Sequence, residues 1–125
     1  MDYYLNPENS QNRLLEEYKI YGSLVVAFDF DDTVYDFHKK GRIYNDVITL
    51  IKRLKLLNCY LICWTGQEDL EFVSNYLTAN EIPFDIINEN PPFHKLKSKK
   101  VYANVYLDDR AGLHQVYNEL KYLTE

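Results

Sequence analysis

The chain has 125 residues and a formal net charge of −5, with 46% hydrophobic and 26% charged residues. This length suits one domain with a single hydrophobic core, and this balance is that of a soluble globular protein. The negative charge excludes a global basic field for nucleic acid or for an anionic membrane, although a local basic patch stays open.

Apolar strands and helical patterns alternate along the chain. The sequence predicts, in order, a helix (9–22), a strand (24–30), an irregular segment with room for a short hairpin (32–44), a helix (45–58), a strand (59–64), a helix (65–81), a short strand (84–87), a lysine-rich loop (88–100), a strand (101–107) and a helix (108–123). The first two strand runs are continuously apolar, which is typical of strands buried on both faces. No Pro- or Gly-rich linker interrupts the series, so we expect a single domain over residues 1–125.

This alternation predicts a parallel sheet with helices on both faces and right-handed crossovers. The expected fold class is α/β: a three-layer α/β/α sandwich around a Rossmann-like parallel sheet. In such sheets ligands bind beyond the carboxyl ends of the strands. The residues that follow the four predicted strands are Asp29, Asp31 and Asp32, then Thr65 and Gly66, then Asn88, Glu89 and Asn90, and finally Asp108 and Asp109.

The two cysteines indicate a reducing compartment. Cys59 and Cys63 lie four residues apart in one predicted strand, so their Cα atoms should stand about 13 Å apart. A disulfide needs Cα atoms within about 7 Å, and we therefore expect two buried thiols. The N-terminal sequence lacks the basic and apolar regions of a signal peptide, and no run approaches the roughly 20 apolar residues of a membrane span. We expect a cytoplasmic protein.

The strand ends would bring four or five carboxylates to one edge of the sheet, where they repel each other at neutral pH. A hard cation relieves this repulsion, and oxygen-only ligands favour Mg²⁺, which usually completes its shell with phosphate oxygens. The hydroxyl of Thr65 and the amide of Gly66, at the opening of a predicted helix, would supply donors to that phosphate. A lysine from 95–100 would neutralise remaining charge. An aspartate can attack a phosphoryl group, and a second carboxylate two residues away can donate the proton.

Three segments resemble, in order, the signatures of the haloacid dehalogenase superfamily of phosphohydrolases. The segment "VVAFDFDDT" (25–33) resembles the first signature, an apolar strand that ends in D-x-D-x-T. The segment "YLICWTG" (60–66) resembles the second, an apolar strand that ends in Thr or Ser. The segment "KVYANVYLDDRA" (100–111) resembles the lysine and acidic-pair signature. The first signature alone is a weak signal, whereas the ordered set, each member in strand context, is specific.

The resemblance implies a Mg²⁺-dependent phosphatase that works through an aspartyl-phosphate. Asp29 would be the nucleophile and a metal ligand. Asp31 would protonate the leaving oxygen, then activate water, and would bind Mg²⁺ through its backbone carbonyl. Thr65 would hold a phosphoryl oxygen. Asp109 would ligate the metal directly and Asp108 through water, with the order of this pair left open.

The active-site lysine is open among Lys95, Lys97, Lys99 and Lys100. Similar family members place it about eight residues before the acidic pair, and this spacing selects Lys100 as the catalytic and substrate-binding lysine. Lys97 and Lys99 stay open as alternatives.

Family members usually carry an inserted cap domain, for which this chain has no room. Only 32 residues separate Asp32 from Thr65, and 34 separate Thr65 from Lys100. The open site of a capless member suits a large phosphorylated substrate, such as a phosphoprotein or a nucleic-acid end, or a small one if a homo-oligomer covers the site. The basic segment "DFHKKGR" (36–42) either touches such a substrate or forms a solvated turn.

Two alternatives keep the site but change its function. One is a regulatory module that binds Mg²⁺ and phosphate without turnover, which the intact aspartates argue against. The other is a phosphotransferase or a dehalogenase on the same scaffold. Dehalogenation needs no metal, so the acidic pair argues against it. We expect simpler roles for Asp32 as a local cap, for Arg110 as the partner of a carboxylate, and for the three histidines as surface residues.

Overall fold

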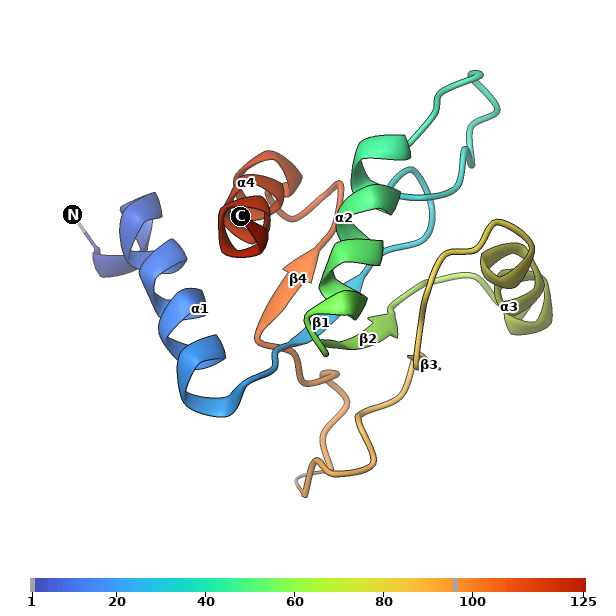
Figure 1. Cartoon of the computed structure of the whole chain (residues 1–125). Coiled ribbons are helices and arrows are strands. Elements are labelled where there is room, and N and C mark those ends of the chain that lie inside the picture. The colour runs from blue at the N-terminus through green and yellow to red at the C-terminus, as the bar shows by residue number, and fades with distance from the viewer. Residues whose placement is uncertain (1, 96) are drawn as a thin grey trace.

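The computed structural model describes residues 2–95 and 97–125 and contains a parallel sheet with helices packed around it (Figure 1). The strands are β1 (Val25–Phe28), β2 (Tyr60–Cys63), β3 (Ile86–Ile87) and β4 (Val105–Leu107), paired in the order β3-β2-β1-β4. The helices are α1 (Pro7–Tyr21), α2 (Asn45–Leu56), α3 (Leu70–Ala79) and α4 (Leu113–Thr124), preceded by a short 3-10 helix, η1 (Tyr3–Leu5). The predicted α/β fold with a Rossmann-like parallel sheet is confirmed.

The register of the central strand β1 aligns the carboxyl ends of its two neighbours. Phe28, the last residue of β1, lies opposite Cys63 of β2 and Leu107 of β4. The pattern continues one step further, because the Asp29 amide donates to the Leu107 carbonyl at 2.9 Å and the Trp64 amide donates to the Phe28 carbonyl at 2.8 Å. The residues that follow these three strands therefore begin at the same edge of the sheet.

The two faces of the sheet are covered differently. On one face, Val26 and Phe28 belong to a large core that takes in buried or half-buried residues from all four helices. On the other face, Val25 and Ala27 pack with Val101 and its neighbours, in a smaller cluster that contains no helical residue among those described. The residues that supply this second cover, 88–104, form the irregular crossover that returns from β3 to β4 at the bottom of Figure 1.

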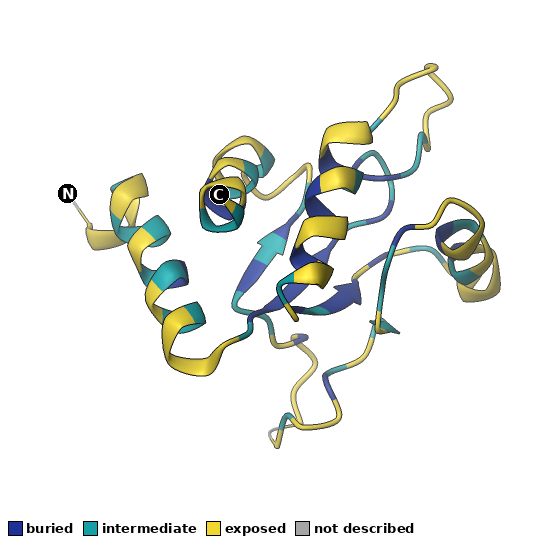
Figure 2. Cartoon of the chain, in the orientation of Figure 1, coloured by how far each residue is buried: buried dark blue, intermediate teal, exposed yellow. Residues whose placement is uncertain are grey.

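Topology explains this asymmetry. We expected helices on both faces. With the strand order β3-β2-β1-β4, right-handed steps from β1 to β2 and from β2 to β3 place α2 and α3 on one face. The return from β3 to β4 runs in the other direction across the sheet and so covers the opposite face. Because its sequence is rich in Pro and Lys, this crossover forms the second outer layer with no helix among its described residues, 88–95 and 97–104 (Figure 2).

Three predicted elements begin four or five residues later than expected, two of them where a side chain takes over backbone hydrogen bonds and the third after a tight turn. The helix expected over 65–81 begins at Leu70, where the Asp69 side chain accepts from the Phe72 amide at 3.0 Å and caps it. The strand expected over 101–107 begins at Val105, because Asn104 meets β1 with its side chain rather than its amide alone. The helix expected over 108–123 begins at Leu113, after a turn that ends at the left-handed Gly112.

Residues 32–44 form consecutive turns, and no hairpin strands occur there among the described residues. Both cysteines are buried free thiols, and burial raises the pKa of each. Within the described ranges, no helix is long and apolar enough to cross a membrane.

Candidate functional site

Three carboxylates converge at the carboxyl edge of the sheet. One oxygen from each of Asp29, Asp108 and Asp109 lies within 4.8 Å of the others. Asp29 follows β1 and the acidic pair follows β4, so the parallel pairing of these neighbouring strands creates the cluster. The cluster forms part of a cavity of about 340 Å³ lined by Asp29, Asp31, Asp32, Phe37, His38, Gly66, Asp108, Asp109 and Arg110.

Thr33 connects two carboxylates of the cluster through its hydroxyl group. Its side chain is fully buried, and its hydroxyl lies 3.3 Å from Asp29 Oδ2 and 3.4 Å from Asp109 Oδ1. The same oxygen accepts a hydrogen bond from the Asp109 amide at 3.2 Å. A threonine at this position thus ties the β1 loop to the β4 loop and fixes the spacing between two carboxylates.

The ionisation of Asp29 reflects this crowding. Partial burial, the adjacent Asp109 and the negative charge of Asp108 together raise its pKa to about 7, against the lowering effect of the Phe30 amide. A carboxyl group with such a pKa marks a place where negative charges are packed more closely than water can screen. A bound cation would reverse this cost.

The other two aspartates of "DFDDT" have separate surroundings. Asp31 lines the cavity, and its Oδ1 accepts from the Gln67 side-chain amide at 2.9 Å. Asp32 has a left-handed backbone, with φ of 57°, and its carboxylate pairs with His38 at 2.5 Å and accepts from Tyr44 at 3.3 Å. These partners lower the pKa of Asp32 despite the opposing effect of desolvation. Asp32 therefore orders the loop, a structural role as expected, although it does so through these side chains and not as a helix cap.

Thr65 and Gly66 are separated from the helix that we expected them to open. Because α3 is capped by Asp69, the Gly66 amide does not lie at a helix N-terminus, and the expected contribution of a helix dipole there was wrong. Gly66 lines the cavity, whereas Thr65 is buried beside it and its hydroxyl accepts from the Gln67 amide at 3.1 Å. Asn88 clamps Thr65, since its side chain accepts from the Thr65 amide and donates to the Thr65 carbonyl, both at 2.8 Å.

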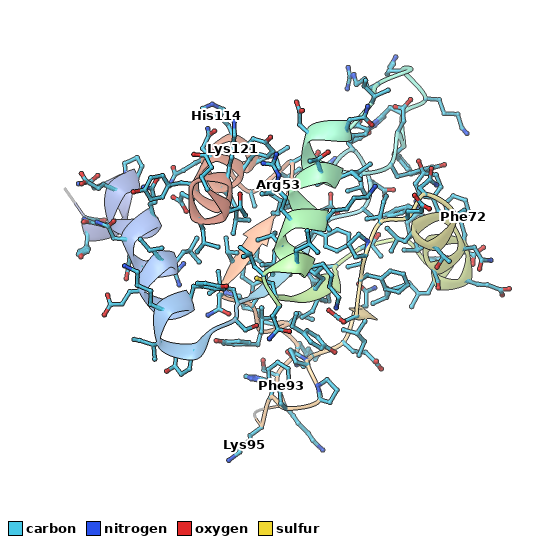
Figure 3. All side chains as sticks on the ribbon, viewed as in Figure 1. Arg53, Phe72, Phe93, Lys95, His114 and Lys121 are labelled. Atoms are coloured by element: carbon cyan, nitrogen blue, oxygen red, sulfur yellow. The ribbon has the colours of Figure 1, made fainter. Side chains whose placement is uncertain are left out.

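The structure does not bring Lys100 to this cavity. Its ammonium lies 5.6 Å from the ring centre of Tyr106, and it lines a different cavity formed by the crossover 88–104. Lys97 and Lys99 are exposed on the same segment and do not line the acidic cavity either. Figure 3 shows Phe93 and Lys95 at the lower end of this crossover, with Lys95 pointing away from the rest of the chain.

Arg110 is the cationic side chain that lines the acidic cavity together with His38. We expected Arg110 to pair with a carboxylate, but among the described residues it forms no ion pair. Only its backbone amide contacts the cluster, donating to Asp108 Oδ1 at 2.8 Å. His38 is partly engaged with Asp32. Arg110 is an exposed residue of the cavity lining.

The donor set fits a hard divalent cation. It consists of carboxylate oxygens alone, two of them linked through Thr33, and no His or Cys belongs to the cluster of three. Asp29, Asp108 and Asp109 are the residues that would hold the ion, in the manner that Mg²⁺ and similar ions prefer.

Sequence reasoning assigned no role to Thr33 or Gln67, and it named Asn88 only as one of the residues that follow the third strand. Thr33 carried a signal, since it completes D-x-D-x-T. Asn88 carried a weaker one, because it follows a predicted strand directly. Gln67 carried none, because its reach to Asp31 depends on the irregular path of residues 65–69.

Comparisons with known proteins agree on the fold and add little else. No model of a protein family and no curated protein matches the chain. A solved structure, of a conserved protein coded by a locus from Bacteroides thetaiotaomicron, is similar with a TM-score of 0.65 and 24% sequence identity. The similarity covers 80% of this chain and 91% of that one, and at this identity it supports the α/β architecture alone.

Proposed function

We propose that the protein is a Mg²⁺-dependent phosphatase that hydrolyses a phosphomonoester through an aspartyl-phosphate. The observation that carries the proposal is the convergence of Asp29, Asp108 and Asp109 within 4.8 Å, in one cavity with Asp31. Such a cluster at the carboxyl edge of a parallel sheet fits a cation and the phosphate that commonly accompanies it. The resemblance of three ordered segments to haloacid dehalogenase phosphohydrolases supports the same function.

Asp29 is the proposed nucleophile. One of its carboxylate oxygens attacks phosphorus, the bond from phosphorus to the ester oxygen breaks, and the leaving oxygen takes a proton from Asp31. Water then attacks the aspartyl-phosphate while Asp31 accepts a proton from it, so inorganic phosphate leaves and both carboxyl groups return to their starting states. Asp31 suits the second role because it lines the cavity outside the group of three.

Mg²⁺, when bound by Asp29, Asp108 and Asp109, would neutralise negative charge on these residues and on the phosphoryl oxygens. The backbone carbonyl of Asp31 is a further proposed ligand. Gly66 lines the cavity, and its amide is the proposed donor to a phosphoryl oxygen, whereas the neighbouring Thr65 is buried and does not line the cavity. Arg110 is better placed than Lys100 to balance the phosphate charge, because it lines the cavity.

A second candidate is a regulatory module that binds Mg²⁺ and phosphate without turnover. One observation favours it: no lysine is among the described residues that line the acidic cavity. The four aspartates favour the phosphatase, since a module that only binds has no need of a nucleophile and a separate proton donor. A phosphotransferase on the same scaffold would differ only in the acceptor that replaces water.

Steady turnover of an aryl phosphate tests the proposal. Release of inorganic phosphate should require Mg²⁺ and stop in EDTA, and the rate should return when Mg²⁺ is added in excess. Turnover that is unaffected by EDTA would contradict the proposed metal dependence. Binding of Mg²⁺ and phosphate with no product under any condition would favour the regulatory module.

The setting of this activity is also proposed. The buried free thiols of Cys59 and Cys63 suit a cytoplasmic location. The open cavity suits a phosphorylated substrate of substantial size, or a homo-oligomer in which a second subunit covers the opening.

A further inference from the structure

Phe37 is an aromatic residue that lines the acidic cavity and does not belong to the hydrophobic core. Phe37 lines the cavity and is 48% exposed. Its closest aromatic neighbour is His38, whose ring is perpendicular to it with the two centres 5.1 Å apart. An exposed phenylalanine gains little from folding, because its apolar area stays in water.

The backbone around Phe37 is nevertheless well fixed. The Asp36 carboxylate accepts from the Lys40 amide at 3.1 Å and from the Gly41 amide at 2.8 Å, which closes the loop on one side. His38 pairs with Asp32 and holds the other side, and the Phe37 amide itself donates to the Tyr35 carbonyl at 2.9 Å. The ring is therefore presented by an ordered loop.

The cavity thus has two chemically different parts. The carboxylates of Asp29, Asp108 and Asp109 lie together and suit a cation with a phosphate, whereas Phe37 offers an apolar surface on the wall of the same cavity. A phosphate seated against the carboxylates would place its ester group elsewhere in the same cavity, where Phe37 is the aromatic lining residue other than His38. Aromatic rings attract one another in stacked or edge-to-face geometry beyond the effect of area burial alone.

We propose that Phe37 determines substrate specificity and selects phosphomonoesters in which an aromatic group lies close to the phosphate. This inference rests on the proposed function only in that the cavity binds a phosphate. The two sources of such a group are a simple aryl phosphate and the base of a nucleotide.

Binding of two phosphonates to the Mg²⁺-loaded protein tests the inference without turnover. Phenylphosphonate and methylphosphonate carry the same anionic group and differ in the ring. By titration calorimetry, phenylphosphonate should bind about tenfold more tightly. Phe37→Ala should remove this difference and leave the affinity for methylphosphonate unchanged, whereas Phe37→Tyr should keep most of it.

Phe93→Ala is the matched control. Phe93 is 61% exposed on the crossover and does not line the acidic cavity, so its removal should leave both affinities unchanged (Figure 3). A nucleotide source is indicated if adenosine 5′-monophosphate binds more tightly than ribose 5-phosphate, and an aryl source if only the phenyl compound shows the preference.

The outcomes separate this inference from the proposed function. Equal affinity of the two phosphonates in the wild-type protein, or an equal loss of both in Phe37→Ala, would overturn the inference alone. A clear preference in a protein that never turns over an ester would retain the inference and remove the phosphatase. If neither phosphonate binds, the inference is overturned, and turnover of an aryl phosphate decides the proposed function separately.

Discussion

The loops at the carboxyl edge of the sheet and the crossover 88–104 differ in charge, in order and in the way they meet the sheet. The edge loops collect aspartates, and these are tied to one another and to the strands through Thr33 and through backbone hydrogen bonds. The crossover carries four exposed lysines and touches the sheet mainly through Val101 and a few aromatic rings. The chain as a whole is acidic, yet the lysines of the crossover do not line the acidic cavity. The crossover lies at the bottom of Figure 1.

This separation shows why charge composition alone says little about a site. Like charges are gathered where their repulsion is costly, and the lysines of the crossover do not line the same cavity. A site that served only to stabilise the fold would bring lysine and aspartate together, because an isolated buried carboxylate is costly. The retained repulsion around Asp29 is what we expect if the cation of the proposed function, and not the chain, balances the charge.

Among the changes in the edge loops, removal of the proposed nucleophile should have the largest effect on activity. Asp29→Asn should lower kcat for an aryl phosphate by about 1,000-fold or more, because an amide cannot form the aspartyl-phosphate. The measurement is steady-state phosphate release with Mg²⁺ present.

Asp32→Asn is the matched control for this change. It removes the same charge from the same loop, but Asp32 is engaged by His38 and Tyr44. Activity should fall by less than about tenfold. Comparable losses in the two variants would mean that the cavity responds to total charge and that Asp29 has no special role.

Loss of a metal ligand comes next in size. Asp109→Asn should weaken Mg²⁺ binding by about 100-fold, since Asp109 is one of three carboxylates in the cluster and is also fixed by Thr33. Mg²⁺ should raise the melting temperature of the wild-type protein and leave that of the variant nearly unchanged at the same concentration. An equal thermal shift in both proteins would place the ion somewhere else.

The next effect in size distinguishes Arg110 of the edge loops from Lys100 of the crossover. Arg110→Gln should raise KM for a phosphate ester by about tenfold, because Arg110 lines the cavity and a charged hydrogen bond to phosphate is lost. Lys100→Gln should change KM by less than twofold, because its ammonium lies over Tyr106 in another cavity. The reverse order of effects would show that the crossover reaches the site during catalysis, as the family resemblance implied.

The smallest expected effect is on stability. The pKa of Asp29 is about 7 in the folded chain against 3.8 for an ordinary aspartate. The folded state therefore holds a proton that the unfolded state has lost, so the free energy of unfolding falls as pH rises from about 4 through 7.

In EDTA, the free energy of unfolding in urea should decrease between pH 5 and pH 8. The decrease should be about 1 kcal/mol larger for the wild-type protein than for Asp29→Asn, after allowance for solvent screening. Addition of Mg²⁺ at pH 8 should return to the wild-type protein the stability that it loses at this pH. An identical pH dependence of the two proteins would contradict the crowding of charge inferred for the cluster.

Much of the fold could be predicted because the signal was local. The strands around Val26 and Leu61 are apolar runs, and such runs specify buried parallel strands without reference to the rest of the chain. The convergence of Asp29 with Asp108 and Asp109 followed from topology, since parallel strands end at one edge. These parts depended on periodicity and on the common direction of parallel strands, both of which the sequence pattern predicts, whereas the strand order came from the structure.

The remainder depended on side chains that compete with the backbone. Asp69, and not Thr65, caps α3, and both residue types are good caps, so propensity alone could not choose between them. The place of Lys100 depends on the path of an irregular crossover, which has no period to read. Spacing to the acidic pair selected Lys100, but a residue count in a loop does not fix direction in space.

The hydrogen bonds of Asn88 connect the loop beside the acidic cavity to the edge strand β3. The Asn88 side chain forms two hydrogen bonds with the Thr65 backbone just beyond the end of β3. The loop that carries Gly66 is therefore held by a strand of only two residues. The amide proton of Thr65 can exchange with solvent only when this edge frays, and it should exchange together with the amides of Ile86–Ile87. A ligand that holds Gly66 in place would slow exchange along β3 as well, at a strand that it does not touch.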